Sequence, residues 1–336
     1  YNSLFNLSQI PLGSPSQGTL AIYLPVSRWS PNRDDLYKLP DMMHLQGLDN
    51  IVVNKLKLDA PKADLIEWNK IVELKLHPVN EINIAMVGKY IDLRDAYISL
   101  TEALLHGGIK TSTKVNIHYI ESQDIEKDGV GPLKNMDGIV VPGGFGDRGI
   151  EGKISTVRYA RENDIPYLGI CLGMQVAIIE IARHLANLDD AQSTEFDKKT
   201  PHPVIALITE WQESSGSIEE RNEQSDLGGS MRLGAQKINL TENSLIKKIY
   251  HKDSIQERHR HRYEFNNNYR DVMTEAGIIF SGTSVDDLVE VIELSSKSWF
   301  VATQFHPEFT SNPRDGHPLF KSFVRACVTK KSEAEN

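Results

Sequence analysis

The chain has 336 residues, enough for one large domain or two, and 40% hydrophobic residues are ordinary for a folded globular protein. A formal net charge of −9 argues against broad, non-specific binding to nucleic acid. The two cysteines exclude a disulfide framework and suit a reducing cytoplasm, and no run of about 18 apolar residues predicts a membrane span. We therefore expect a cytoplasmic protein without nucleic-acid or membrane partners.

The first 80 residues divide into two stretches. Residues 1–33 are rich in Ser, Pro, Gly and Asn, with one possible strand at 19–26, and we expect them to be poorly ordered. Leu and Ile recur through residues 34–80, which predicts helices with several breaks, as in a linker or the tail of a preceding domain. Because the chain opens on Tyr1 rather than Met, we expect a fragment or a trimmed chain.

A domain of alternating strands and helices is expected over residues 81–328, followed by a polar tail at 329–336. This alternation is typical of an α/β fold with a mostly parallel central sheet and helices on both faces. The polar stretch at 210–229 predicts a long loop or lid. The expected strands are 82–87, 115–120, 138–141, 166–170, 204–209, 288–294 and 299–305, and the expected helices are 92–106 (stopped by Gly107-Gly108), 150–162, 172–185 and 318–328.

A candidate nucleophile lies in the sequence PYLGICLGMQ, residues 166–175. An apolar strand leads into Gly169-Ile170-Cys171-Leu172-Gly173 and then a helix, which is the cysteine form of the G-x-S-x-G nucleophile elbow. The turn would place Cys171 at a helix N-terminus, where the helix dipole favours the reactive thiolate. Cys327 lacks these surroundings, and we expect it to be structural.

A candidate base follows the last expected strand, in the sequence QFHPE at residues 304–308. Pro307 argues against a helix, so we expect His306 and Glu308 to project to the same side of an extended segment. A carboxylate beside an imidazole can hold its tautomer and stabilise the imidazolium. A lone His is more often structural, but the elbow and Glu308 together favour a Cys-His-Glu triad for acyl transfer.

The glycine-rich stretch PGGFG at 142–146 follows a strand, so its amides could form an oxyanion hole. Residues 144–149 also satisfy G-x-G-x-x-G, the dinucleotide-binding fingerprint, which is the main alternative. This alternative is weak, because the preceding strand is the third of the series and the elbow would have no purpose in a dehydrogenase.

The run RHRHRYE at 258–264 is dense in cations. In an acidic chain we discount nucleic acid, and two His at i, i+2 without nearby Cys or Asp make a poor metal site, so no metal is expected. Arg binding a substrate carboxylate is favoured, because the guanidinium fork matches that group. A solvated basic strand remains the alternative.

With these residues in hand, a resemblance becomes apparent. PGGFG, GICLGMQ (169–175) and HPE (306–308) together resemble the class I, or triad, glutamine amidotransferases. QSTEF (192–196), GGSMRLG (228–234) and ERHRHRYE (257–264) resemble more closely the glutaminase domain of CTP synthases of the bacterial type.

The likeness runs from about residue 34 to residue 325. Residues 34–58 resemble only the tail of the N-terminal amidoligase domain of these enzymes, which binds UTP, ATP and Mg²⁺. Residues 1–33 do not resemble that domain. The resemblance thus predicts a chain that carries the glutaminase activity alone.

The resemblance also implies roles for matching residues. Cys171 would attack the amide of L-glutamine, His306 would transfer protons, and Glu308 would orient His306. The glutamine site and its oxyanion donors would comprise Gly144 and Leu172 (both oxyanion), Phe145, Gly173, Met174, Gln175, Glu195 and Arg262.

The same resemblance implies partners. These are an amidoligase domain that receives the ammonia, GTP as an allosteric activator near the 210–229 loop, and a homotetrameric assembly. No cofactor is expected in this chain, since Mg²⁺ and ATP would belong to the amidoligase domain. Two alternatives are a catalytically silent fragment with a binding or regulatory role, and another cysteine hydrolase on the same fold.

Overall fold

The computed structural model describes residues 33–89, 94–207 and 231–335. The expected strand at 19–26, the start of the helix at 92–106 and the loop at 210–229 lie outside these residues. The chain divides into two compact units, residues 1–63 and 64–336. Residues 64–80 group with the large unit.

The described part of the small unit is helical, as the Leu and Ile pattern predicts. It contains η3 (Arg33–Lys38), α1 (Leu39–Leu45) and α2 (Leu48–Leu56). Gly47 joins α1 to α2 in the left-handed conformation that glycine adopts without strain. Leu45 and Leu56 are each more than half exposed, at 77% and 62%, so the apolar side chains of this unit are incompletely covered within it.

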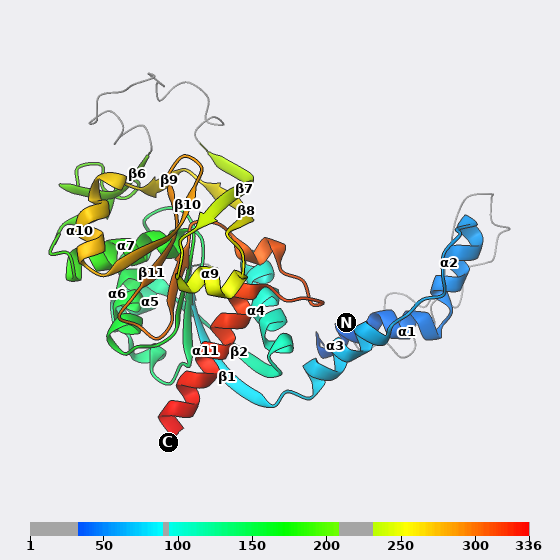
Figure 1. Ribbon diagram of the computed structural model, residues 1–336. Coiled ribbons are helices and arrows are strands. Elements are labelled where there is room, and N and C mark those ends of the chain that lie inside the picture. Colours follow the sequence, from blue (N-terminus) through cyan, green and yellow to red (C-terminus); the bar gives the residue numbers. More distant parts are fainter. Residues whose placement is uncertain (1–32, 90–93, 208–230, 336) are drawn as a thin grey trace, which may run out of the picture. The chain divides into compact units, whose positions relative to one another are not determined.

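A nine-stranded sheet forms the centre of the large unit, in the order β2-β1-β3-β4-β12-β11-β10-β7-β8 (Figure 1). The first five strands in this order are parallel neighbours, and each later strand pairs antiparallel with the one before it. β10 and β8 therefore point the same way as the parallel strands, which confirms the mostly parallel sheet. The strands are β1 (Asn80–Gly88), β2 (Thr113–Glu121), β3 (Gly138–Val141), β4 (Tyr167–Ile170), β7 (Arg232–Leu240), β8 (Ser254–His261), β10 (Ile278–Ser284), β11 (Val289–Leu294) and β12 (Phe300–Thr303).

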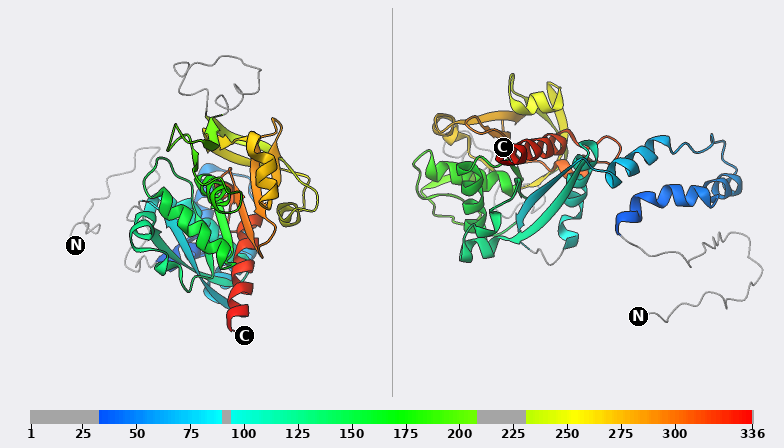
Figure 2. Two further views of the ribbon diagram at one scale, coloured as in Figure 1. Left: turned by 90° about the vertical axis from the view of Figure 1, so that its left-hand side faces the viewer. Right: turned by 90° about the horizontal axis from the view of Figure 1, so that it is seen from below.

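Helices cover both faces of this sheet (Figures 1 and 2). The alternation of a strand sends successive side chains to opposite faces, so Ile84 and Met86 of β1 pack in one apolar cluster and Ala85 and Val87 in the other. α4 (Ile98–Lys110), α9 (Leu245–Tyr250) and α11 (Pro318–Glu335) contribute to the first cluster. α5 (Ser122–Asp128), α6 (Ile150–Glu162) and α7 (Leu172–His184) contribute to the second.

Smaller elements complete the large unit. A three-stranded sheet has the order β5-β6-β9. No helix of the described ranges is both long and apolar enough to cross a membrane. The remaining elements are α3 (Ile66–Leu76), α10 (Arg270–Glu275), β5 (Ala191–Ser193), β6 (His202–Leu207), β9 (Tyr263–Phe265), η4 (Arg94–Tyr97), η5 (Gly131–Leu133), η7 (Asn267–Tyr269) and η8 (Pro307–Thr310).

Two helices run further than predicted. α4 continues through Gly107 and Gly108, where the sequence indicated a stop. A Cβ on Gly107 would lie 2.9 Å from the Phe320 carbonyl oxygen, and one on Gly108 would lie 2.6 Å from that of Thr113. These glycines therefore allow α11 and β2 to approach α4, rather than ending it. α11 extends to Glu335, through most of the predicted polar tail.

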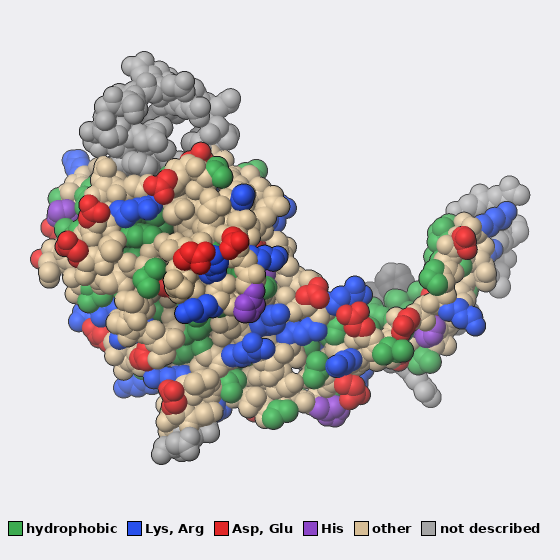
Figure 3. All heavy atoms as spheres, in the orientation of Figure 1, with side chains coloured by type: hydrophobic (Ala, Val, Ile, Leu, Met, Phe, Trp, Pro, Cys, Tyr) green, Lys and Arg blue, Asp and Glu red, His purple; other side chains and the backbone are tan. Residues whose placement is uncertain are grey.

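Acidic and basic side chains are interspersed over much of the face in Figure 3. Lys110 and Arg325 line a polar groove together with Asn80 and Thr113, the first residues of β1 and β2. Cys171 instead follows the last residue of β4. Because parallel strands begin at one edge of a sheet and end at the other, this groove is remote from the candidate nucleophile.

The packing of α6 on α5 generates a stability prediction. A Cβ on Gly152 of α6 would lie 1.9 Å from the carbonyl oxygen of Ser122 in α5. We expect Gly152→Ala to lower the free energy of unfolding by about 1–3 kcal/mol, although Ala is the better helix former, because the backbones must separate. Gly131→Ala is the control, since a Cβ there meets nothing within 4 Å. Urea unfolding measures both, and equal stability of Gly152→Ala and the wild type would contradict the packing argument.

Candidate active site

The nucleophile candidate occupies the sharp turn between β4 and α7, as predicted. Cys171 is the residue before α7 and has φ 54° and ψ −104°. A residue other than glycine rarely adopts such a backbone conformation. The conformation costs about 1–3 kcal/mol and persists only where neighbouring structure enforces it. The amide of Cys171 donates to the carbonyl of Thr303 at 2.7 Å, which ties the turn to β12.

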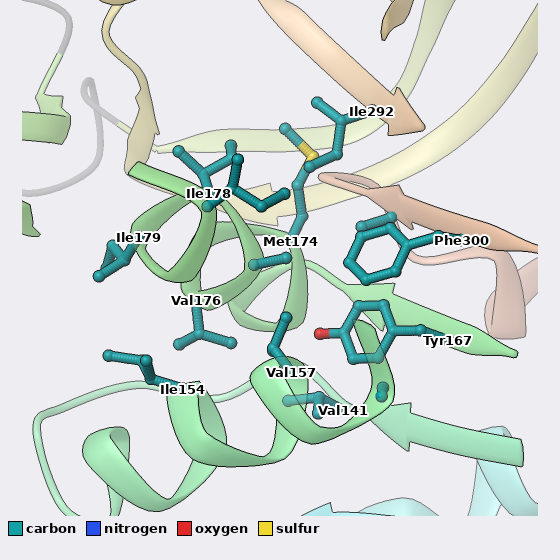
Figure 4. Packing of buried hydrophobic residues seen from close by; sticks show 14 of the residues in the cluster. Val141, Ile154, Val157, Tyr167, Met174, Val176, Ile178, Ile179, Ile292 and Phe300 are labelled. Carbon is teal, nitrogen blue, oxygen red and sulfur yellow. The ribbon is translucent and has the colours of Figure 1, made fainter. Parts of the chain in front are cut away.

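Close packing around Gly173 enforces this turn. Val141, Tyr167 and Phe300 belong to one packed apolar cluster (Figure 4). A Cβ on Gly173 would lie 2.1 Å from the carbonyl oxygen of Val141, so only glycine lets the first turn of α7 approach β3 this closely. The Tyr167 hydroxyl donates to the Gly173 carbonyl at 2.8 Å, and the Tyr167 ring stacks on Phe300 at 4.6 Å between centroids. The position of the turn is therefore fixed from β3, β4 and β12 together.

The two cysteines have different surroundings. Cys171 is 3% exposed, and the Gln304 side-chain amide lies 3.6 Å from its sulfur. Cys327 is fully buried in α11, where burial, followed by the charge of Asp137, raises the pKa of its thiol well above the ordinary value. A Cβ on Gly138 would lie 2.3 Å from the Cys327 sulfur. Cys327 is thus a protonated packing residue, in line with the structural role expected for it.

His306 and Glu308 meet, but not on an extended segment. Nδ1 of His306 lies 2.7 Å from Oε1 of Glu308. Pro307 begins the one-turn helix η8, so the prediction of an extended segment was wrong. Proline is accommodated at the first position of a helix because its missing N–H would have no helical partner there. The backbone amide of His306 donates to the carbonyl of Arg258 at 2.8 Å, which fixes the turn to β8.

The electrostatics of His306 favour its charged form. Burial alone would lower the pKa of His306, but hydrogen bonds with Cys171 and Glu308, and the negative charges of both, outweigh it and raise the pKa to about 10. His306 is therefore an imidazolium at neutral pH when Cys171 is a thiolate. The side chains of Cys171, His306 and Glu308 form one connected group.

The glycine-rich loop after β3 runs beside this group. A Cβ on Gly143 would lie 2.9 Å from Cε1 of His306, so the loop passes directly against the imidazole. Lys89 Nζ donates to the carbonyl of Phe145, and the amide of Gly146 donates to Glu195 at 2.9 Å. Lys89 and Glu195 therefore hold the loop. The contact of Lys89 with this loop was not predicted, although the position of Lys89 directly after β1 was a usable signal.

The residues expected in the glutamine site are placed as follows. Gly144 lies near Leu172, since a Cβ on Gly144 would be 3.3 Å from Cδ2 of Leu172. The half-exposed Phe145 side chain belongs to the same loop, whereas Met174 is buried in the first turn of α7. Burial raises the pKa of Glu195, an effect that the hydrogen bond from Gly146 opposes.

Gln175 and Arg262 are further members of the expected site. The Gln175 side chain is buried and donates to the Tyr263 carbonyl at 3.1 Å and to Oε1 of Gln304 at 3.3 Å. It therefore helps to position Gln304, whose amide faces the Cys171 sulfur. Arg262 is half-buried in the short connection between β8 and β9.

The cation-rich run is split by strand alternation. Glu257, His259 and His261 of β8 face inward and are buried, whereas Arg258 and Arg260 face outward and are exposed. The run is therefore neither a uniformly solvated basic strand nor a uniform binding surface. Its inward half packs beneath the candidate site.

A buried charged cluster, not foreseen from the sequence, adjoins this inward row. The Arg232 guanidinium lies 3.6 Å from Glu264 and 3.7 Å from Glu290, and His259 Nδ1 lies 2.9 Å from His261 Nε2. The oxygens of both carboxylates have no hydrogen-bond partner among the described residues. An E-x-H-x-H alternation on a strand was the only sequence signal for it.

Burial governs the charges in this cluster. Burial raises the pKa of Glu290 to about 8, although the positive charge of Arg232 acts in the opposite direction. Burial and the negative charge of Glu290 together raise the pKa of Glu264 well above its usual value. Burial also lowers the pKa of His259 to about 3. Within the described residues, His259, His261 and Glu290 could offer three metal ligands within 4.8 Å of one another. Arg232 already supplies a cation beside Glu290, which opposes a second one.

Comparison with known proteins identifies the class to which this fold and site belong. The family model of class I glutamine amidotransferases matches residues 92–326. The chain belongs to this family, which confirms the expected fold class and excludes the dinucleotide-binding alternative as an account of the whole domain.

One solved structure gives a closer likeness, and two others match more distantly. The chain is similar to the glutaminase domain of the Trypanosoma brucei CTP synthase with bound acivicin, at 36% identity and a TM-score of 0.67, covering 74% of this chain and 94% of that one. It also matches a GMP synthase component from Thermoplasma acidophilum, at 16% identity and a TM-score of 0.44 over 77% and 97% of the two chains. A Thermotoga maritima glutamine amidotransferase matches at 11% identity and a TM-score of 0.40 over 75% and 98%.

The raised pKa of His306 predicts how stability depends on pH. Because folding raises this pKa from 6.5 to about 10, protonated His306 favours the folded state. The contribution is complete below about pH 6.5 and is lost as the pH rises towards about 10. We expect the difference in unfolding free energy between wild type and His306→Ala to shrink across this range. Urea unfolding at several pH values measures it, and a difference that grows with pH would contradict the imidazolium assignment.

Proposed function

We propose that this chain hydrolyses L-glutamine to glutamate and ammonia with Cys171 as nucleophile. The observation that carries the proposal is the group at the elbow, in which Cys171 and His306 both adjoin Gly143 and Nδ1 of His306 lies 2.7 Å from Oε1 of Glu308. A strained nucleophile turn beside a base with its own orienting carboxylate is the arrangement that acyl transfer requires.

The reaction follows from this geometry. The Cys171 thiolate attacks the side-chain amide carbon of glutamine, and the carbonyl oxygen becomes an oxyanion. The backbone amides of Gly144 and Leu172 would donate to that oxyanion. His306 gives its proton to the amide nitrogen, which leaves as ammonia, and a glutamyl thioester remains on Cys171. His306 then takes a proton from water, whose attack on the thioester releases glutamate.

Glutamine recognition is assigned to two charged residues, Glu195 and Arg262. Glu195 would bind the substrate ammonium, and Arg262 would bind the carboxylate through its guanidinium fork. The raised pKa of Glu195 supports this assignment, because a buried carboxylate gains most from a cationic partner. Phe145, Gly173, Met174 and Gln175 would complete the walls of the site.

We further infer that the ammonia is used for amination of UTP to CTP in pyrimidine nucleotide synthesis. The 36% identity to a CTP synthase glutaminase domain supports this, since that relative combines substantial identity with a matching fold. An amidoligase domain carrying ATP and Mg²⁺ would receive the ammonia. GTP would stimulate the glutaminase step, the assembly would be a homotetramer, and the reaction would take place in the cytoplasm.

Replacing the nucleophile gives a direct test. Cys171→Ser should abolish glutamine hydrolysis without changing the far-UV circular dichroism spectrum, because a serine hydroxyl is far less acidic than a thiol. Cys327→Ser is the matched control, and it should retain activity. Acivicin, which the similar T. brucei domain binds, should label Cys171 in the wild type.

Peptide mapping of the acivicin adduct reads out the same assignment independently of turnover. Label on Cys327 would reject Cys171 as the nucleophile. Absence of both label and ammonia release would favour a catalytically silent protein that serves in binding or regulation. Labelling with hydrolysis of esters but not of glutamine would favour another cysteine hydrolase.

The carboxylate-binding role of Arg262 makes a separate prediction. Arg262→Ala should raise KM for glutamine by about 30-fold or more, because loss of one partner of a desolvated ion pair costs roughly 2–5 kcal/mol. Arg260→Ala is the control, since Arg260 faces outward on the adjoining strand. Steady-state ammonia release measures KM in both. An equal change in the two variants would point to general loss of charge rather than a specific contact.

A further inference from the structure

A buried carboxylate lies behind the turn that carries His306 and Glu308. Glu257 on β8 is 4% exposed and has three donors around it. Its Oε1 accepts from the Tyr250 hydroxyl at 3.0 Å and from His317 Nε2 at 2.9 Å. Its Oε2 accepts from the Thr310 hydroxyl at 2.9 Å. A carboxylate satisfied on both oxygens in this way is held rigidly, since charge-assisted hydrogen bonds are among the strongest in proteins.

The hydrogen bonds of His317 support the direction of these bonds. The backbone amide of Leu319 donates to Nδ1 of His317 at 3.3 Å, so Nδ1 is an acceptor. A ring proton is therefore on Nε2, which faces Glu257. Tyr250 fits the same scheme, because burial, together with the charge and hydrogen bond of Glu257, raises the pKa of its hydroxyl and keeps it a donor.

Adjacent residues of β8 hold both ends of the turn. The Arg258 carbonyl accepts from the backbone amide of His306, where the turn begins. The Glu257 side chain accepts from Thr310, the last residue of η8. The Thr310 hydroxyl also lies 3.2 Å from the Pro307 carbonyl, but its single proton is directed to the nearer, charged Glu257. Between these two attachments lies Glu308.

We propose that Glu257, acting through Thr310, is a positioning residue for the triad. A single turn of 3₁₀ helix has weak internal hydrogen bonding, so its orientation depends on external attachments. Releasing the Thr310 end would let η8 rotate about its other attachment and move the Glu308 carboxylate away from His306. Small displacements of catalytic groups reduce turnover strongly. This inference rests on the proposed glutaminase function, and it gives a role to the inward-facing Glu of the ERHRHRYE run.

The test removes one hydroxyl at a time. Thr310→Val deletes the donor to Glu257 at nearly constant volume, and Thr310→Ser restores a hydroxyl. Thr274→Val is the matched control, because Thr274, like Thr310, is exposed, and its hydroxyl donates to a carbonyl within its own helix α10, at 2.8 Å. Glu257→Gln tests the acceptor, and a thermal unfolding curve for each variant establishes that it folds.

Two readouts separate positioning from a purely structural role. We expect Thr310→Val to lower kcat for glutamine about tenfold or more while KM changes less than about twofold, because the substrate contacts are untouched. The pH at which Cys171 alkylation by iodoacetamide reaches half its maximum should also move upward, since a displaced imidazolium stabilises the thiolate less. Thr310→Ser should recover most of both properties, and Thr274→Val should change neither.

Each possible result either supports or overturns the positioning role of Glu257 and Thr310. A Thr310→Val protein that is less stable but has unchanged kcat and an unchanged alkylation profile would overturn the proposal. If the wild type releases no ammonia from glutamine, the proposed function fails, and the alkylation profile alone then decides: an upward shift in Thr310→Val supports positioning, and no shift refutes it. A Glu257→Gln protein that folds and matches the wild type in both readouts would also refute it.

Discussion

The contact between the first turn of α7 and strand β3 is the constraint on which the rest of the site depends. Gly173 lies so close to the Val141 carbonyl that no side chain fits between them. Because the helix is held there, Cys171 must take up a backbone conformation with φ 54°. The strain is balanced by the hydrogen bonds from Cys171 to Thr303 and from Tyr167 to Gly173. The proposed nucleophile is thereby placed before any substrate arrives, which is the preorganisation that catalysis would require.

The two halves of the sheet make separate contributions. The parallel half supplies the elbow after β4 and the glycine-rich loop after β3. The antiparallel extension supplies β8, whose backbone receives the amide of His306 and whose Glu257 reaches Thr310. β12 lies at the junction of the two halves and leads directly into His306. His306, the proposed base, thus follows the last parallel strand, and β8 of the antiparallel half holds the turn on which it lies.

The parallel half of the sheet and the positions of the two short motifs proposed to be catalytic could be predicted from the sequence, because each expresses a local rule. Apolar strands alternate with amphipathic helices, and glycines flank Cys171 where backbones meet. The antiparallel strands β7, β8 and β10 were not predicted. Their inward positions include Glu257, His259 and His261, which a hydrophobicity pattern scores as exposed. Only tertiary partners such as Tyr250 and His317 make their burial possible.

Two further differences have the same origin. Gly107 and Gly108 look like a helix stop, but their backbones are needed for close contact with α11 and β2. Pro307 looks like a helix breaker, but it opens η8, where its fixed φ is compatible with helical geometry. In each case the residue type restricts the backbone, and contacts distant in sequence decide how the restriction is used. Those contacts are not encoded in any short window of the chain.

Because buried and exposed positions alternate along β8, neighbouring residues in this short run are under two different constraints. Its inward residues are tied to particular partners within the domain, so each could change only together with another residue elsewhere. The side chains of Arg258 and Arg260 project outward into solvent, so their replacement would disturb little of the packing beneath the strand. Over evolutionary time, positions that accept substitutions should therefore alternate along β8 with positions that do not. The fixed positions along β8 would mark the face that stabilises the fold, and the variable positions would mark the face that is free to acquire a new function.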